Sequence, residues 1–334
     1  MKHATKILSV LFCIALLFSV AACGGNTDTG SADDSYTAAD MSVACLKGPT
    51  GVGMAQLMDA SEQANTANNY TFTVAAAADE ISGKIVSGEI NIASVPTNLA
   101  AKLYQKTEGN ITMLAVNTLG VLSILENGDS VSSVADLKGK TIYSTGEGSN
   151  PEYILRYILS ENGIDPDKDV TIQYLATNDE LIAALVSGTA EIAMVPEPAA
   201  TTVLTKKDTL NRAFAVNDAW EEVSDSSLMM GCVVTLKSYA EANPDAIAKF
   251  LEEYEASIDF AQNNIDEAAT MCETYGIIPG AAIAKAAIPN CNLTFVSGKE
   301  MKNAIGGYFD VLFQADPTSI GGKLPADDFY YGIQ

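Results

Sequence analysis

The chain has 334 residues and a formal net charge of −23, with 42 acidic side chains against 19 basic ones. An acidic surface of this kind repels nucleic acids and anionic lipid headgroups, so proteins whose main partner is either of these are excluded. The length suits two domains rather than one.

The first 22 residues have the plan of a secretory signal. Lys2 and Lys6 precede an apolar run over residues 7–22, which is short for a membrane span. The end of this run, Val20-Ala21-Ala22-Cys23, resembles the lipobox of bacterial lipoproteins. The resemblance implies cleavage before Cys23 and lipid attachment to that cysteine, and an ordinary secretory signal is the alternative. Residues 23–40 are rich in Gly, Ser, Thr and Asp, so we expect a flexible tether.

Loss of residues 1–22 would also remove His3, the only histidine of the chain. Without histidine, catalysis by Ser-His-Asp or Cys-His groups is excluded, and the usual ligand of catalytic zinc is missing. No catalytic residue is therefore expected. Cysteines at CxxC spacing are absent as well, so we expect neither a metal site nor a cofactor.

A segment of the chain occurs twice, which predicts two similar lobes. Residues Asp79–Ala100 recur without a gap at Asp179–Ala200, 100 positions later, and ten of the paired residues are identical. Each copy has the pattern of an amphipathic helix end, a glycine stop, a short apolar strand and a proline-marked loop. Two facing lobes form a cleft, and clefts are the usual place for ligands.

The repeat continues upstream in a looser form. Strand-like runs at 42–46 and 141–145 each lead through a glycine-bearing loop into a helix, and second strands follow at 70–74 and 170–174. This order predicts an α/β fold in which each lobe has a mostly parallel sheet flanked by helices. Ligands of such sheets bind beyond the carboxyl ends of the strands. We therefore expect the loops that begin at Lys47, Pro96, Ser144 and Pro196 to converge.

The last third of the chain contributes helices and cysteines. Asn243 as N-cap, Pro244 in the first turn and Gly276 beyond the end predict one long helix.

Of the cysteines beyond the tether, Cys45 and Cys232 lie in apolar strand-like runs that are typical of the core, whereas Cys272 and Cys291 are able to pair. The sequence does not choose among the possible pairings.

Signal, lipobox, tether and duplicated body together resemble the solute-binding lipoproteins of bacterial ABC importers. The segments 136–142, 188–195 and 197–200 look most like the branch that serves nitrate, sulfonates, bicarbonate and thiamine-pyrimidine precursors. The resemblance implies a two-lobed periplasmic-binding-protein-like fold of type II with a two-strand hinge. It implies one lobe from 41–117 plus 224–334 and another from 118–223. It also implies an extracytoplasmic monomer that holds a small solute, reaches the membrane only through its lipid, and serves a permease with its ATPase.

The candidate ligand-binding residues come from the loops at the strand ends. They are Lys47, Gly48, Thr50, Thr97, Asn98, Asn117, Ser144, Thr145, Gly146, Glu147, Ser149, Asn150 and Glu197. Backbone N–H groups at helix starts suit carboxylate, sulfonate or carbonyl oxygens, and the hydroxyls add donors and acceptors. The same hydroxyls suit helix capping.

Charge in these loops favours a neutral solute or one with mixed donors and acceptors, such as a nitrogen heterocycle. The only arginines, Arg156 and Arg212, lie outside the predicted loops, so a bidentate anion clamp has no evident donor. Glu147 and Glu197 lie inside them and repel anions. The single tryptophan, Trp220, suits either stacking on a ring or burial in the core.

Two other classes of function remain open. One is an exported enzyme on the same scaffold, which would use Lys47 with Glu147 or Glu197 as an acid-base pair. The other is a surface protein that senses a ligand and signals to a membrane receptor.

Overall fold

The computed structural model describes residues 36–333, and the residues from Thr37 onward form one compact unit. The expected signal over 1–22, Cys23 and most of the tether over 23–40 lie outside the described residues. Within residues 36–333, no helix combines the length and the apolar composition that crossing a membrane requires.

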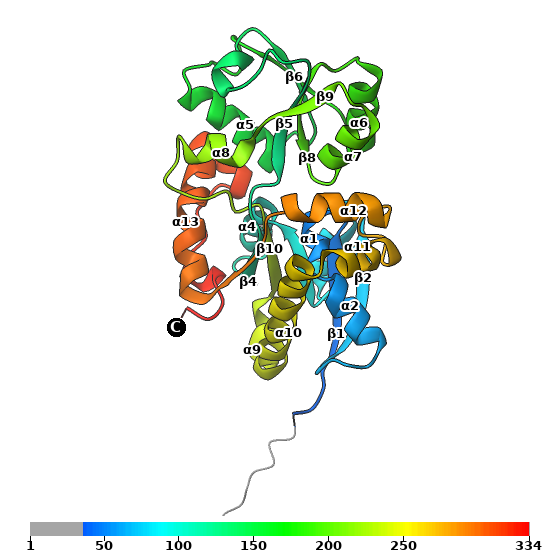
Figure 1. Cartoon of the computed structure of the whole chain (residues 1–334). Coiled ribbons are helices and arrows are strands. Elements are labelled where there is room, and N and C mark those ends of the chain that lie inside the picture. Colours follow the sequence, from blue (N-terminus) through cyan, green and yellow to red (C-terminus); the bar gives the residue numbers. More distant parts are fainter. Residues whose placement is uncertain (1–35, 334) are drawn as a thin grey trace, which may run out of the picture. The chain divides into compact units, whose positions relative to one another are not determined.

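Strands and helices alternate through most of the described chain (Figure 1). The strands are β1 (Asp40–Leu46), β2 (Asn69–Ala75), β3 (Ile92–Pro96), β4 (Ile111–Thr118), β5 (Leu122–Asn127), β6 (Thr141–Ser144), β7 (Thr171–Tyr174), β8 (Ile192–Pro196), β9 (Leu210–Ala215), β10 (Gly231–Leu236) and β11 (Leu293–Ser297). The α-helices are α1 (Pro49–Val52), α2 (Ala55–Glu62), α3 (Asp79–Ser87), α4 (Thr97–Lys106), α5 (Asn150–Glu161), α6 (Asn178–Ser187), α7 (Ala199–Lys206), α8 (Val216–Glu221), α9 (Lys237–Ala242), α10 (Pro244–Asn263), α11 (Ile265–Thr274), α12 (Ala281–Ala287) and α13 (Gly298–Ala315). Short 3-10 turns lie at Val134–Leu137, Ile288–Asn290, Pro317–Ile320 and Asp327–Phe329.

The strands form two sheets, which confirms the predicted α/β class. One sheet has the order β11-β4-β10-β3-β1-β2 and the other has the order β7-β6-β8-β5-β9. The strands that belong to the repeat pair in parallel, β1 with β2 and β3, and β6 with β7 and β8. The strands outside it, β4, β5, β9, β10 and β11, add antiparallel pairs, so both sheets are mixed. The repeat carries no information about these added strands, which is why the sheets were predicted to be mostly parallel.

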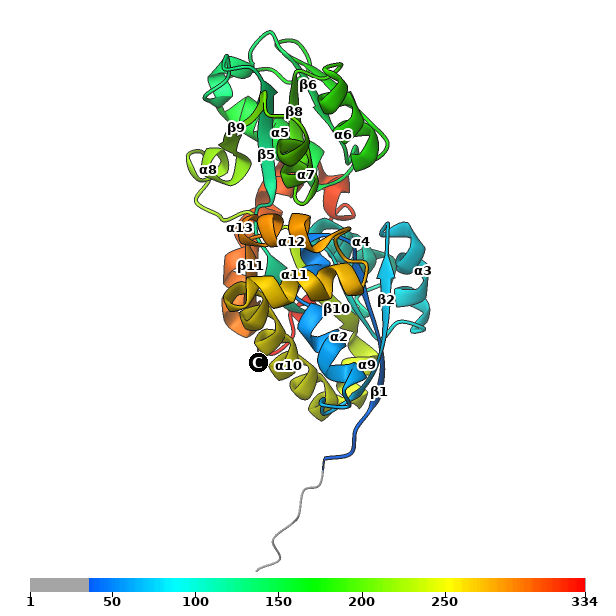
Figure 2. The same cartoon turned by 45° about the vertical axis from the view of Figure 1, so that its right-hand side comes forward.

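The two copies of the repeat have the same local structure. Helices α3 and α6 each bury two aliphatic side chains, Ile81 and Ile85 in the first copy and Leu181 and Leu185 in the second. Both helices end at a glycine in the left-handed region, Gly88 with φ 78° and Gly188 with φ 82°. Strands β3 and β8 follow, and α6 and α7 pack on each other and on β8 (Figure 2). The repeat therefore predicted these elements correctly.

Alanine at Gly88 or Gly188 should lower the free energy of unfolding by about 1–2 kcal/mol, because a Cβ is disfavoured at positive φ. Gly83 is the matched control, since it lies inside α3 where an added Cβ would have no neighbouring atom within 4 Å, and the second copy already has Ala183 there. Gly83→Ala should raise the stability by about 0.5–1 kcal/mol. Urea unfolding of the three variants checks this, and equal effects at Gly83 and Gly88 would contradict it.

The long helix predicted from Asn243 to Gly276 is wrong in one respect. The chain forms two helices, α10 and α11, separated at Asn264, whose φ of −127° and ψ of 59° are not helical. Asn264 ends the first helix and starts the second: its N–H donates to the Phe260 carbonyl, and its own carbonyl accepts from Ala268 N–H. Asparagine favours such cap positions over helix interiors. The predicted stop is correct, since Gly276 has a φ of 67°.

Trp220 and the cysteines are core residues. Trp220 is fully buried, and its indole N–H donates to the Ser226 carbonyl. Cys45, Cys232, Cys272 and Cys291 are all buried free thiols, including the two that the sequence allowed to pair. Burial, with a smaller contribution from the charge of Cys272, raises the pKa of Cys45 to about 12.

Candidate functional site

The carboxyl ends of the parallel strands in the two sheets lie close together, as the strand order predicted. The loop after β1 meets the loop after β8, because a Cβ on Gly48 would lie 3.4 Å from Pro198 Cδ. Thr97, which follows β3, accepts a hydrogen bond over 3.4 Å from the Asn150 carboxamide at the start of α5. Lys102 Nζ donates to the Gly148 carbonyl over 3.3 Å. These contacts place the two predicted loops of the first sheet, which begin at Lys47 and Pro96, against the two of the second, which begin at Ser144 and Pro196.

A buried polar cluster lies at this end of the first sheet, around Asn117 of β4. Asn117 is 1% exposed, and its Nδ2 donates to Ser94 Oγ over 2.6 Å and to the Tyr254 hydroxyl over 2.8 Å. Ser94 in turn donates to the Thr50 carbonyl, and Thr118 donates to Asn117 Oδ1. Burial raises the pKa of Tyr254 well above its ordinary value, although the side chains of Asn117 and Ser94 lower it in part. The cluster is therefore neutral and rich in hydrogen-bonding groups.

Sequence reasoning named Asn117 and Thr50 but missed Ser94 and Tyr254. A signal for Ser94 was present, because the equivalent position in the second copy of the repeat is Met194. A hydroxyl in one of two otherwise similar apolar strands indicates a polar partner. Tyr254 had no such signal, since its spacing matches the core face of α10.

Gly231, the first residue of β10, is required by the close packing of this cluster. A Cβ at Gly231 would lie 2.6 Å from Asn117 Oδ1 and 2.9 Å from Thr50 Cγ2. Only glycine avoids these collisions, because real Cβ atoms do not approach other atoms this closely. The backbone that enters β10 therefore passes directly beside the polar cluster.

On the second sheet, Glu197 and Arg212 form an ion pair. The Glu197 side chain is fully buried, and its Oε1 lies 2.7 Å from Arg212 Nη2. Its Oε2 accepts from the backbone N–H and the hydroxyl of Thr201. Arg212, on β9, also donates to Ser123 Oγ and remains 28% exposed.

This ion pair changes the prediction made for Glu197. The carboxylate is compensated by a guanidinium, so it does not act as the unpaired negative charge from which repulsion of anions was inferred. Arg212 itself lies in no loop at a strand end. The pairing of β9 with β5, in which Leu125 lies opposite Arg212, brings Arg212 beside Glu197. No sequence spacing reveals that pairing.

Comparison with known proteins places the chain in a family. Residues 56–257, more than half of the chain, match the family described as "ABC transporter, phosphonate, periplasmic substrate-binding protein". The chain belongs to this family. Members bind small solutes outside the cytoplasm and deliver them to the permease of an ABC importer.

Solved structures of similar fold agree with the family. An ABC transporter protein from Parabacteroides distasonis has a TM-score of 0.74 and 23% identity, over 88% of this chain and 99% of that one. The periplasmic aliphatic sulphonate binding protein SsuA from Escherichia coli has a TM-score of 0.69 and 16% identity, over 85% and 94%. The periplasmic nitrate-binding protein NrtA from Synechocystis PCC 6803 has a TM-score of 0.57 and 13% identity, over 79% and 74%. These likenesses establish the type II periplasmic-binding-protein fold.

A curated relative matches over a shorter stretch. The Bacillus subtilis (strain 168) protein YtlA is 27% identical over 128 residues, which are 38% of this chain. The chain spans about a third of that relative's length, 36%.

Several predicted site residues of this substrate-binding protein use their hydroxyls for contacts within the second sheet and its loops. Ser149 Oγ donates to the Gly146 carbonyl, Thr145 Oγ1 donates to Asn178 Oδ1, and Ser144 Oγ lies 3.2 Å from the Thr145 carbonyl. Gly146 has a φ of 81°, which the tight turn before α5 requires. Asn98 is buried at the start of α4.

The two exposed charged side chains of the predicted site do not pair with its other residues. Lys47 and Glu147 are both exposed, and within residues 36–333 neither side chain forms a hydrogen bond or an ion pair. The acid-base pair considered for an exported enzyme is therefore not assembled, because Glu197 is paired with Arg212 instead. Among the same residues, no group of three or more His, Cys, Asp or Glu side chains is placed to hold a metal ion.

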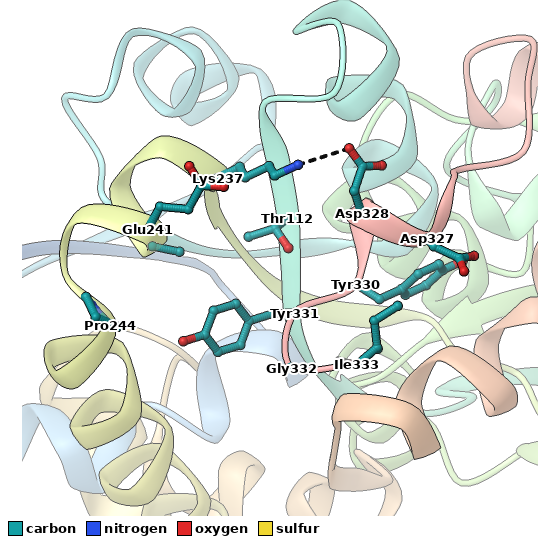
Figure 3. Close-up of a pocket in the computed structure, with 11 residues that line it drawn as sticks. Thr112, Lys237, Glu241, Pro244, Asp327, Asp328, Tyr330, Tyr331, Gly332 and Ile333 are labelled. Carbon is teal, nitrogen blue, oxygen red and sulfur yellow. Dashed lines mark hydrogen bonds and ion pairs between the residues drawn. The ribbon is translucent and has the colours of Figure 1, made fainter.

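A groove of about 720 Å³ lies away from this site (Figure 3). It is lined by residues at the amino end of β4, just beyond β10 and near the carboxyl terminus, including Thr112, Tyr330 and Tyr331. In it, Lys237 Nζ lies 3.1 Å from Asp328 Oδ2, while the Tyr104 hydroxyl donates to Asp328 Oδ1 over 2.6 Å. The groove is at the opposite end of the first sheet from the Asn117 cluster.

Proposed function

We propose that the chain is a lipid-anchored binding protein without catalysis of its own, which captures a small polar solute between two lobes by hinge closure. It then delivers the solute to a permease that is driven by an ATPase. The observation that carries this proposal is the neutral Asn117 cluster at the carboxyl ends of the first sheet, the end at which Gly48 meets Pro198 of the second. Closure over a ligand is a general mechanism of two-lobed binding proteins.

The lobes we propose are residues 41–117 with 224–334, and residues 118–223. The distribution of strands supports this division, because β1–β4, β10 and β11 form one sheet and β5–β9 form the other. The chain passes between the sheets after Thr118 and again before Gly231. We propose these two passages as the hinge. Lipid attachment at Cys23 and a monomeric state complete the proposal.

The solute we propose carries neutral hydrogen-bonding groups. Asn117, Ser94, Thr118 and Tyr254 are uncharged donors and acceptors, and such groups suit amide, hydroxyl or ring-nitrogen atoms. A phosphonate is the second candidate. The exposed part of Arg212 favours it, because guanidinium groups pair well with such oxyanions.

A thermal-shift panel tests the proposal. The full chain with Cys13→Ser and Cys23→Ser is heated with thiamine-pyrimidine precursors, flavins, amino acids, sulfonates, phosphonates, nitrate and bicarbonate. A ligand present at about 100 times its dissociation constant should add about 2.7 kcal/mol of stability. Recovery of the compound unaltered after binding separates a binding protein from an enzyme, and turnover of the compound would overturn the proposal.

Asn117→Ala should abolish the shift produced by any active compound, because it removes a donor that is buried at the strand ends. The shift is measured against the melting temperature of each empty variant, since the substitution also removes the hydrogen bonds that Tyr254 and Ser94 accept from Asn117. Asn69→Ala is the matched control. Asn69 is exposed at the amino end of β2, where its carboxamide donates to Asp40, so this variant should retain the shift. Retention in both variants would place the solute elsewhere.

A further inference from the structure

The side chain of Asn150 is held in one orientation between the two sheets. Asn150 begins α5, is 2% exposed, and has its Nδ2 3.4 Å from both Thr97 Oγ1 and the Met230 carbonyl. Thr97 donates its own hydroxyl proton to the Met229 carbonyl over 2.6 Å. Thr97 therefore accepts from Asn150, and both neighbours of the carboxamide nitrogen are acceptors. Only the nitrogen suits that side, so the oxygen must face the other way.

The Asn150 oxygen has no partner. Of the buried side-chain atoms in residues 36–333, Asn150 Oδ1 is one of three without a hydrogen bond, together with the hydroxyls of Tyr174 and Tyr308. Buried carbonyl oxygens are normally paired, and an unpaired one costs its full desolvation penalty. Asn150 is also the first residue of a twelve-residue helix, where the backbone N–H groups have no partner within the helix.

The nitrogen of the Asn150 carboxamide contacts residues of the first sheet, so the burial of this side chain depends on contact between the two sheets. Asn150 lies between β6 and β7 of the second sheet, whereas Thr97 directly follows β3 of the first and Met230 directly precedes β10. Separation of the sheets at this point would break the two long hydrogen bonds of Nδ2 and admit water to Oδ1. Water would then satisfy the oxygen, so the penalty belongs to the closed arrangement alone.

We propose that the unpaired Asn150 oxygen disfavours closure of the empty protein, and that a solute with an N–H or O–H group removes the penalty by donating to it. This inference rests on the proposed hinge closure. It assigns Asn150 as a specificity-determining residue and restricts the solute to compounds with a hydrogen-bond donor, such as amides, amines, hydroxyls or ring N–H groups. Nitrate has no such donor and is excluded.

Single-molecule energy transfer between dyes on the two proposed lobes tests this proposal. The full chain with Cys13→Ser and Cys23→Ser carries new cysteines at Ser87 and Ser187, the exposed last residues of α3 and α6, while the four core cysteines are buried. Asn150→Leu keeps the approximate shape of the side chain without its polar atoms, so the closed-to-open ratio of the empty protein should rise about tenfold. Asn150→Asp places a negative charge at this position and should lower the closed-to-open ratio. Asn162→Leu, at the exposed other end of α5, should leave it unchanged.

Each outcome decides between the inference and the function on which it rests. If the empty wild type interconverts between two distances while Asn150→Leu leaves their ratio unchanged, the inference fails and hinge closure stands. General disruption would move the Leu and Asp variants in the same direction, which also overturns the inference. A compound without any donor that closes the wild type refutes the donor requirement. A single distance in the wild type, with or without every compound of the panel, removes the proposed hinge function itself.

Discussion

Replacement of Trp220 by alanine should lower the free energy of unfolding by about 3–5 kcal/mol, the usual cost of removing a large buried aromatic side chain. Trp220 is fully buried between two tyrosine rings, with ring centroids 4.9 Å from Tyr157 and 5.6 Å from Tyr308. Tyr157 belongs to α5 and Tyr308 to α13, so one cavity would loosen both helices. The substitution also leaves the Ser226 carbonyl without its donor.

Urea unfolding monitored by circular dichroism measures this loss, since the only tryptophan fluorophore is removed. Trp220→Phe is the graded control, because it retains an aromatic ring and should lose less. Val186→Ala, at an exposed position of α6, should change the stability by less than about 0.5 kcal/mol. A loss below about 1 kcal/mol for Trp220→Ala would mean that Trp220 contributes little to the packing of α5 and α13.

Arg212→Ala should cost about 3 kcal/mol, because it leaves the carboxylate of Glu197 buried without its cation. The exposed fraction of the Glu197 side chain is 0%, so water does not replace the lost guanidinium, and only Thr201 still donates to the carboxylate. Adding Glu197→Gln to Arg212→Ala should recover much of the loss, since no charge then remains buried.

The chain supplies a matched control for this second experiment in Arg156, its other arginine. Arg156 pairs with Glu152 and Asp167, but its side chain is 34% exposed and that of Asp167 is 72% exposed. Arg156→Ala should therefore cost no more than about 1 kcal/mol. Urea titrations of the three variants compare these values. Equal losses at the two arginines would show that burial of Glu197 does not determine the effect.

The internal repeat predicted the elements whose stability is local. Helix ends at Gly88 and Gly188 and the strands that follow depend on spacing within about twenty residues, so a sequence pattern records them. The break at Asn264 was missed because the apolar spacing continues through it, and only backbone geometry ends the helix there.

The candidate site was less accessible to sequence reasoning. Loops at the carboxyl ends of the strands were predicted from topology, and the structure brings Gly48 to Pro198 and Thr97 to Asn150. Ser94, Tyr254 and Arg212 reach the same region from a strand interior, a long helix and an antiparallel strand. Their positions depend on which strands and helices pack side by side, and residue spacing along the chain does not record such pairing.

The neutral character of the Asn117 cluster has a consequence for the setting in which the protein operates. Members of this family work outside the cytoplasm, where acidity follows the surroundings and is not buffered by the cell. Burial keeps Tyr254 protonated, and Asn117, Ser94 and Thr118 have no proton to gain or lose in the ordinary range. No histidine is present in the described chain to titrate near neutrality. The cluster therefore keeps the same charge in mildly acidic and mildly alkaline surroundings.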